Sequence, residues 1–387
     1  MKIVVVGGGI FGVTAALELR RRGHDATLLD PGPLPHPLAE STDISKAVRM
    51  DYGADVTYTR LMEEALDGWR RWNARWETPL FHEDGVMFVT RAPMSPGGFE
   101  HDSYVTLTSR GHRLERMDTE TIRRRFPAWN AELYVDGYRN PAGGWAESGR
   151  VVARLLREAA DVGVVVRGSA RVARVVARGR RVSGIELDDG AFVPGEQVVV
   201  AAGGWTLSIL PHLSSLLRTV AQPVFHLAPA DVAPFSPACF PTFGADIAVT
   251  GYYGFPAHGG VVKIANHGPG RPMHPGDVGA RAVTAGESSA LASFVAGTFP
   301  SLVGAPVVAT RICVYCDTTD EHFLLDRDPS CDGIVVATGG SGHAFKFAPV
   351  LGALIADRVE GKDLPFEGKF AFRPDRGARG EEAARGR

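Results

Sequence analysis

The first 30 residues carry the pattern that most constrains the fold. Residues 3–6 are β-branched and apolar, which is typical of a buried strand, and they lead into Gly7-Gly8-Gly9-Ile10-Phe11-Gly12. Residues 13–22 have the composition of a helix, and a second apolar run over residues 26–29 ends at Asp30. This order predicts a βαβ unit of the kind that begins a dinucleotide-binding domain.

Three glycines of this unit, Gly7, Gly9 and Gly12, match the spacing G-x-G-x-x-G. The first permits a tight turn, the second lets the backbone approach a pyrophosphate, and the third lets helix and strand pack closely. The start of the helix would face the phosphates with its positive end. Asp30 stands where an acid accepts a hydrogen bond from a ribose hydroxyl, which favours FAD or NAD over NADP. An NAD dehydrogenase remains open from these 30 residues alone.

Composition excludes several other classes of protein. The 387 residues hold 42 Lys+Arg against 44 Asp+Glu, a net charge of −2, which argues against nucleic acid as a partner. Four cysteines are too few for a disulfide scaffold. No apolar run is long enough to span a membrane and no secretory signal is visible, so we expect a cytoplasmic protein. The Arg/Gly/Glu-rich residues 371–387 are expected to be a disordered tail.

Lysine is rare, and its positions are therefore informative. Only six of the basic residues are lysine, and biased codon usage accounts for the rarity. It does not account for the positions of Lys263 and Lys346, which lie in the motifs described next, or of Lys46, which precedes Arg49 by three residues.

Four segments carry a more specific signal than the glycine motif. They are Tyr253-Gly-Phe-Pro256, Lys263-Ile-Ala-Asn-His267, Arg311-Ile-Cys-Val-Tyr-Cys-Asp-Thr-Thr-Asp-Glu-His-Phe323 and Gly340-Ser-Gly-His-Ala-Phe-Lys-Phe347. Together with the N-terminal motif they resemble the monomeric sarcosine oxidase family, a branch of the D-amino-acid-oxidase-like FAD enzymes. The resemblance runs from the N-terminus to about residue 360.

The resemblance implies a fold and a domain order. The fold class is α/β: a Rossmann-like FAD-binding domain joined to an α+β substrate domain with a mostly antiparallel sheet. The FAD-binding domain would be discontinuous, and the expected segments are 1–80, 145–218 and 306–370 for FAD and 81–144 and 219–305 for the substrate.

The resemblance also implies an activity. Family members oxidise a secondary, N-methyl or cyclic amino acid to the imine by hydride transfer to FAD, and O₂ then reoxidises the flavin to give H₂O₂. The implied partners are an amino or imino acid and O₂, and we expect a monomer or small homo-oligomer without a metal. A flavin dehydrogenase that passes electrons to another acceptor, and a non-catalytic nucleotide-binding protein, are the alternatives.

Cys313 occupies the position at which most family members attach FAD covalently. Attachment needs a nucleophilic thiolate, which nearby cations favour. The pair Cys313 and Cys316 also fits a metal or redox C-x-x-C, but the chain has no second such pair and no suitably spaced histidines. A disulfide between the two in flavin-free protein stays open.

The implied catalytic residues surround an amino acid carboxylate and the flavin. Arg49 and Lys346 match the pair that holds the carboxylate, for which a guanidinium is well suited. Lys263 matches a lysine that activates O₂, because an ammonium stabilises superoxide. The remaining catalytic matches are an active-site histidine, His267, and two tyrosines of the substrate cavity, Tyr253 and Tyr315.

Further residues match positions around the cofactor. Lys46 replaces an arginine that stands beside the flavin ring in well-known family members, so the charge is kept and the planar fork is lost. The other expected cofactor contacts are Thr42, Val172, Gly203, Trp205, Gly340, Gly342, His343 and Lys346. Ser41, Thr42 and Asp43 are N-cap residue types, so we expect a short helix there with Lys46 and Arg49 on one face.

Overall fold

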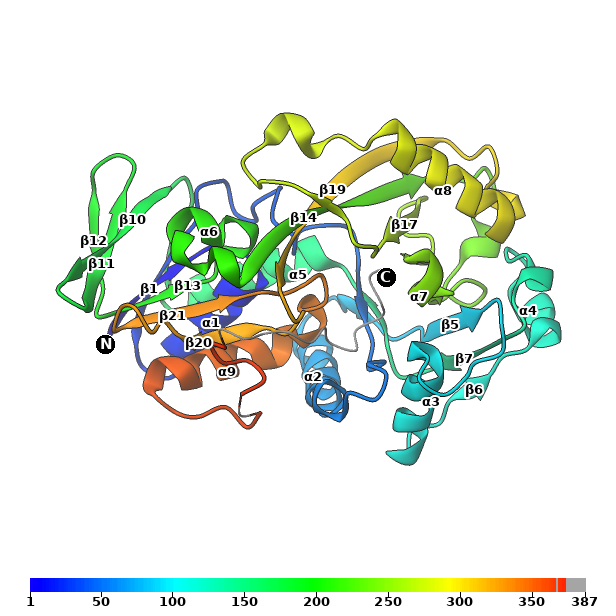
Figure 1. The fold of residues 1–387 in the computed structure, drawn as a ribbon, viewed down its shortest axis with the longest axis horizontal. Coiled ribbons are helices and arrows are strands. Elements are labelled where there is room, and N and C mark those ends of the chain that lie inside the picture. Colours follow the sequence, from blue (N-terminus) through cyan, green and yellow to red (C-terminus); the bar gives the residue numbers. More distant parts are fainter. Residues whose placement is uncertain (367, 374–387) are drawn as a thin grey trace.

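The computed structural model describes residues 1–366 and 368–373. Two sheets with their covering helices lie at opposite ends of the molecule, and one long pair of strands runs between them (Figure 1). The chain crosses between the two ends several times, so each end is built from segments that are distant in sequence.

The first sheet is parallel except at one edge. Its strand order is β20-β21-β13-β1-β2-β9, and only β20 runs antiparallel to its neighbour. The bounds are β1 Lys2–Val6, β2 Asp25–Leu29, β9 Val165–Arg167, β13 Gln197–Val200, β20 Leu324–Arg327 and β21 Ile334–Thr338. Side chains alternate along β1, so Ile3 and Val5 enter one apolar core while Val4 and Val6 enter another.

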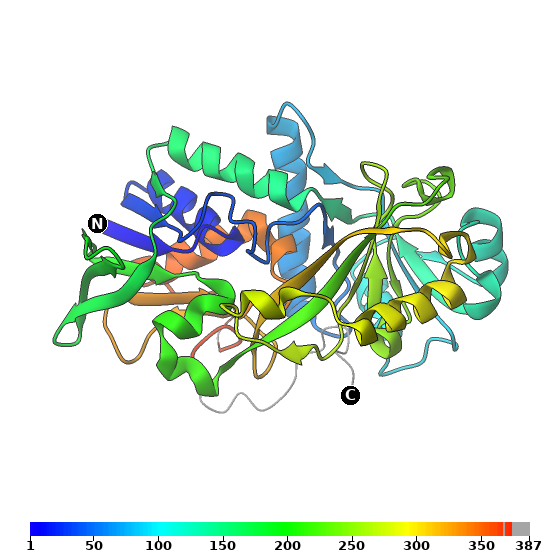
Figure 2. The same cartoon turned by 90° about the horizontal axis from the view of Figure 1, so that it is seen from above.

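Helices cover the Ile3 and Val5 side of this sheet. They are α1 (Ile10–Arg21), α2 (Val56–Arg75), α5 (Ser148–Asp161) and α9 (Ala348–Glu360), and Figure 2 shows α5 lying across the outer side of the group. Asp55 caps α2 by accepting a hydrogen bond from Tyr58 N. The buried stripe of α2 includes Trp69, whose Nε1 donates to Lys346 O at 2.7 Å. The tryptophans of α2 are therefore part of the packing.

The opposite side of the first sheet packs on a small antiparallel sheet. Its strands are β10 (Val172–Arg178), β11 (Arg181–Leu187) and β12 (Phe192–Pro194). Val182 and Ile185 of β11 share an apolar core with Val4 and Val6. The short α6 (Thr206–Ile209) follows β13 on this side.

The second large sheet is antiparallel except for one parallel pair, β15 with β5. Its strand order is β18-β14-β17-β16-β15-β5-β7-β6, with β19 paired to β14. The bounds are β5 Val86–Thr90, β6 Glu115–Arg116, β7 Asp136–Asn140, β14 Leu217–Leu227, β15 Thr242–Ala245, β16 Tyr252–Gly254, β17 Val262–Asn266, β18 Arg271–Pro272 and β19 Val307–Thr318.

Helices flank this second sheet as well. They are α3 (Phe99–Ser109), α4 (Thr119–Arg125), α7 (Ile247–Thr250) and α8 (Ala285–Thr298). Met87 and Val89 of β5 join the core beneath α8, and Val86 and Phe88 face the other way. This alternation gives the site an apolar wall, as described below.

The fold class expected from the sequence is confirmed: a parallel Rossmann-like sheet and a largely antiparallel second sheet form a mixed α/β structure. The predicted boundaries of the two domains stay a prediction. Of the tail expected over 371–387, residues 371–373 are ordered against the fold, because Phe372 N donates to Asp326 and Arg373 pairs with Asp320. The rest of it, residues 374–387, lies outside the described residues.

The helix predicted after residues 41–43 is wrong. Residues 46–48 form strand β3 (Lys46–Val48), which pairs with β8 (Gly144–Ala146), and β4 (Phe81–His82) pairs with β8 on its other side. Serine, threonine and aspartate also serve turns by bonding to nearby backbone. Here Thr42 Oγ1 donates to Ala39 O, and Asp43 Oδ1 accepts from its neighbour Ile44 N.

Candidate functional site

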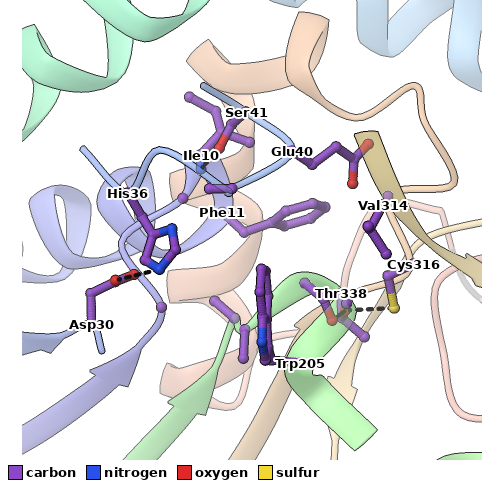
Figure 3. A pocket seen from close by; sticks show the side chains of 18 of the residues that line it. Ile10, Phe11, Asp30, His36, Glu40, Ser41, Trp205, Val314, Cys316 and Thr338 are labelled. Atoms are coloured by element: carbon purple, nitrogen blue, oxygen red, sulfur yellow. Dashed lines mark hydrogen bonds and ion pairs between the residues drawn. The ribbon is translucent and has the colours of Figure 1, made fainter. Parts of the chain in front are cut away.

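A cavity of about 280 Å³ opens at the carboxyl end of β1, where the glycine motif lies. Figure 3 shows Asp30 and His36 at one end of it, Cys316 and Val314 at the other, and the rings of Phe11 and Trp205 between them. We call it the main cavity. Several segments that are distant in sequence meet around it, including residues 201–205 after β13 and 340–345 after β21.

The turn after β1 has the geometry that a dinucleotide needs. Gly7 has φ +106°, a conformation that favours glycine, and a Cβ on Gly12 would lie 1.8 Å from Gly7 O. The N-cap of helix α1 is Gly9, which has no side chain to accept a hydrogen bond from the first N–H groups. Ile10 N instead donates to Ser41 Oγ at 3.1 Å. The positive end of α1 thus borders the main cavity, as anion binding requires.

Asp30 follows β2 and lines the same cavity. Its carboxylate accepts hydrogen bonds from Gly8 N at 2.8 Å and Gly32 N at 3.0 Å. Burial raises the pKa of Asp30, and the two backbone donors oppose that effect. Because a carboxylate can accept about four hydrogen bonds, acceptor positions remain for a ribose.

At the other end of the main cavity, β19 presents its two cysteines differently. Val314 and Cys316 line the cavity, whereas the Cys313 thiol meets Lys46 Nζ at 3.5 Å. Alternation along the strand explains why Cys313 and Cys316 face opposite sides. Burial raises the pKa of Cys316 to about 12, which keeps its thiol protonated. Both cysteines are free thiols.

A second, small cavity of about 60 Å³ adjoins the main one, since Lys46, Gly342 and Phe345 line both. Its charged residues are the cations Lys46, Arg49 and Lys346. The rest of its lining is apolar and aromatic with a few polar groups: Ala47, Val86, Phe88, Thr242, Phe243, Ile247, Tyr253, His267, Gly342, His343 and Phe345.

Arg49 is held firmly at the edge of the small cavity. It is 7% exposed, its Nη1 donates to Asp51 O, and its guanidinium lies over the rings of Tyr52, Phe88 and Phe99 at 5.2, 5.7 and 5.6 Å. Burial raises the pKa of Asp51. The three cations that line the small cavity make it suited to a carboxylate.

Lys46 lies between the two cavities and close to Cys313. Burial lowers its pKa, but the nearby groups Cys313, Tyr253 and Asp43 outweigh that effect and raise the pKa above the usual value. The ammonium is therefore charged at neutral pH.

Lys263 lines neither cavity. Its Nζ lies 2.6 Å from Asp43 Oδ2, donates to Ser45 O at 2.5 Å, and sits 4.7 Å from the centre of the Phe255 ring. Burial lowers the pKa of Lys263 to about 8, and Asp43 partly offsets this effect. Despite its burial, the pKa of Asp43 is well below the usual value because of Lys263, His226 and Lys46.

The structure brings most of the predicted site residues together. The main cavity is lined by Gly7, Gly9, Asp30, Lys46, Val172, Gly203, Trp205, Gly340 and Gly342, and the small cavity by Lys46, Arg49, Tyr253, His267, Gly342, His343 and Lys346. The predicted residues that line neither are Gly12, Thr42, Lys263, Cys313 and Tyr315. Thr42 is turned toward His36 O and Ala39 O, and Tyr315 packs against Gly342 and His267.

Several residues of the site were missed by the sequence reasoning. Ser41 caps α1, Asp43 and His226 accompany Lys263, and Tyr52 contacts Lys346 at 2.7 Å. Asp43 carried a usable signal, because an aspartate was visible within three residues of Lys46. The others depend on contacts between distant segments.

Residues 1–366 and 368–373 contain neither a membrane-spanning helix nor a cluster of metal ligands. No helix there is both long and apolar enough to cross a membrane. No group of three or more His, Cys, Asp and Glu side chains within the same residues could hold a metal ion.

A βαβ unit with the geometry for a dinucleotide lies beside a cation-lined cavity, as is expected of an FAD-dependent oxidoreductase. The model of the FAD dependent oxidoreductase family matches residues 2–358. The chain belongs to this family, and FAD is its cofactor. The predicted family and enzyme class are thereby confirmed.

The chain is similar to curated oxidases over nearly its whole length. It is 27% identical to N-methyl-L-tryptophan oxidase of Salmonella enteritidis PT4, covering 94% of this chain and 96% of that one. It is also 27% identical to L-saccharopine oxidase of Schizosaccharomyces pombe, covering 96% and 92%.

Solved structures share the fold. Amadoriase II, a fructosamine oxidase of Aspergillus fumigatus, superposes with a TM-score of 0.84 at 24% identity and covers 100% of this chain and 93% of its own. The fructosyl peptide oxidase of E. terrenum gives a TM-score of 0.85 at 22% identity, with coverage of 100% and 95%. At these identities the likeness establishes the fold.

Proposed function

We propose that this protein is an FAD-dependent amine oxidase that converts a secondary, N-methyl or cyclic amino acid to the imine. The observation that carries the proposal is the meeting of Arg49 and Lys346 in a small cavity that adjoins the main cavity at Lys46 and Gly342. The similarity to N-methyl-L-tryptophan oxidase and L-saccharopine oxidase, which are oxidases of N-substituted amino acids, supports the same class of reaction on CH–NH groups.

Bound FAD would supply the redox chemistry: the substrate C–H electron pair leaves as hydride, the amine loses a proton as the C=N bond forms, and O₂ takes up two electrons and two protons to give H₂O₂. The chain supplies binding and orientation. Arg49 and Lys346 hold the carboxylate, and the apolar wall of Phe88, Phe243 and Ile247 receives the substrate side chain. His267 and Tyr253 contact the substrate near its amine.

We also propose that FAD is attached covalently through Cys313. Cys316 opens onto the main cavity, but its raised pKa keeps it protonated, whereas Cys313 has the Lys46 ammonium 3.5 Å from its sulfur. A thioether to flavin forms from a thiolate, so the protonated Cys316 is the poorer candidate. SDS treatment should leave flavin on the wild type and on Cys316→Ser and should release it from Cys313→Ser. Release from all three would refute the covalent bond.

One role in the proposal belongs to a residue outside the cavities. Lys263 was expected to activate O₂, and we retain this role for its ammonium, which donates to Ser45 O next to Lys46 in the chain. In the alternative function, a dehydrogenase, another acceptor takes the electrons. The ion pair between Lys263 and Asp43 supports this alternative, because Asp43 offsets the positive charge that Lys263 would offer to O₂.

The deciding experiment is a panel of amino acids and amines with the purified holoenzyme, read by flavin bleaching without O₂ and by peroxide release with O₂. We expect bleaching by at least one N-substituted amino acid and one H₂O₂ per substrate oxidised. Bleaching without peroxide would establish the dehydrogenase, and the absence of bleaching with the whole panel would refute both functions.

A further inference from the structure

A chain of buried hydrogen bonds connects Lys346 to the backbone of a distant loop. Lys346 Nζ donates to Tyr52 OH at 2.7 Å, and Tyr52 OH lies 2.9 Å from His343 Nδ1. His343 Nε2 lies 3.0 Å from Glu321 O. Tyr52, His343 and Lys346 are 1%, 3% and 4% exposed, so bulk water does not compete for these bonds.

The chemistry of the last acceptor sets the direction of every bond in the chain. A backbone carbonyl can only accept, so His343 Nε2 carries the proton that it donates to Glu321 O. In the neutral imidazole Nδ1 is then an acceptor, and Tyr52 donates its hydroxyl proton to it. The lone pairs of the Tyr52 oxygen are left to face Lys346, whose ammonium can only donate.

Two features fix the ends of this chain. Glu321 has φ +63°, a left-handed conformation that is costly for a residue with a Cβ, and Glu321 N donates to Thr318 O at 3.2 Å. The His343 ring stacks on Phe323 at 4.8 Å with an interplanar angle of 27°. The carbonyl and the imidazole are thus both held before any ligand arrives.

We propose that Tyr52 and His343 are positioning residues that hold the Lys346 ammonium in place for a substrate carboxylate. A lysine has a long flexible stem and no fixed fork of donors, so its ammonium needs an external partner to be preorganised. Arg49 has such partners of its own, namely Asp51 O and three aromatic rings. This inference rests on the proposed function, because it assigns the carboxylate to Arg49 and Lys346.

The first test is equilibrium binding of cyclopentanecarboxylate, which has no amine to oxidise, to the holoenzyme by calorimetry. Tyr52→Phe removes only the hydroxyl and keeps the ring that Lys346 overlies at 4.6 Å, and we expect it to raise Kd about tenfold. Tyr58→Phe is the matched control. Tyr58 stacks on Tyr52 at 4.8 Å, but its hydroxyl accepts from Phe323 N, so Kd should change less than twofold.

Three further measurements separate positioning from a general structural role. In a Lys346→Met background, Tyr52→Phe should have no further effect on Kd, because the ammonium it positions is gone. His343→Gln can still donate to Glu321 O and accept from Tyr52, so it should bind cyclopentanecarboxylate within threefold of the wild type. His343→Leu should weaken binding as much as Tyr52→Phe. In turnover, Tyr52→Phe should raise KM and change kcat less than twofold.

The outcomes distinguish this inference from the proposed function. If the wild type binds the carboxylate and Tyr52→Phe binds it equally well, or if its full effect persists in the Lys346→Met background, the positioning role is refuted and the proposed function stands. If the wild type binds no carboxylate and no amine bleaches its flavin, both are refuted.

Discussion

Lys263 Nζ and Asp43 Oδ2 lie 2.6 Å apart, and both side chains are at most 3% exposed. His226 Nε2 lies 3.6 Å from the other oxygen of Asp43, and β14 pairs His226 directly with Lys263. The second sheet thus places Lys263 and His226 beside Asp43, which lies on the loop before β3. Because water is excluded, neither charge can be removed without leaving the other poorly compensated.

Asp43→Asn should lower the free energy of unfolding by about 3 kcal/mol, because it leaves the Lys263 ammonium buried without its counter-ion. Urea unfolding of the holoenzyme at pH 7 measures this. The double variant Asp43→Asn/Lys263→Met should be less destabilised than Asp43→Asn alone. An unchanged unfolding midpoint for Asp43→Asn would contradict the buried ion pair.

Lys263 should also give stability a characteristic pH dependence. Burial lowers the pKa of Lys263 from 10.5 to about 8 in the folded protein. Between these values the unfolded chain binds more protons at this position, so the contribution of Lys263 to the free energy of unfolding increases with pH. The free energy of unfolding, measured by urea unfolding, should therefore increase from pH 8 to 10 for the wild type relative to Lys263→Met. A flat difference over that range would show that the pKa is not lowered.

The thiols should differ in reactivity. Burial raises the pKa of Cys316 to about 12, so almost no thiolate is present at pH 8, whereas Cys239 is partly exposed. We expect iodoacetamide to label Cys239 at least ten times faster than Cys316 in the folded protein, as measured by peptide mass spectrometry. Protein denatured in urea is the control, and there the two rates should converge. Rapid labelling of Cys316 in the folded state would disprove its protected environment.

Gly12→Ala should abolish tight FAD binding, because the added Cβ would lie 1.8 Å from Gly7 O and would push α1 away from β1. Gly297→Ala, within helix α8, is the matched control. The nearest atom to its new Cβ is 3.9 Å away, and alanine has the higher helix propensity. Flavin content per purified protein is the measurement. Equal flavin content in the two variants would show that the close approach of α1 is not needed.

Local patterns in the sequence predicted the parts of the fold that local geometry determines. The turn from Gly7 to Gly12 needs glycines at its left-handed and closely packed positions, and the run of β-branched residues before it favours a buried strand. The β3 strand was missed because residues 41–43 suit a turn as well as a helix cap.

The site was predicted less completely, because its contacts join distant segments. Arg49 and Lys346 were found through motifs, but the Tyr52 hydroxyl between Lys346 and His343 was not, since a tyrosine in sequence carries no sign of what its hydroxyl meets. The partner of Lys263 was missed for the same reason: Asp43 precedes it by 220 residues.

The strand order of the first sheet has a consequence for biosynthesis. The glycine motif is synthesised before the strands that complete its sheet, because β1 pairs with β13 at Gln197–Val200 and β13 pairs with β21 at Ile334–Thr338. The cavity is completed later still, by residues 340–345. A nascent chain therefore carries its nucleotide-binding motif on an unfinished sheet until β21 has been made. The complete main cavity is thus available to a cofactor only after residues 340–345 have been synthesised.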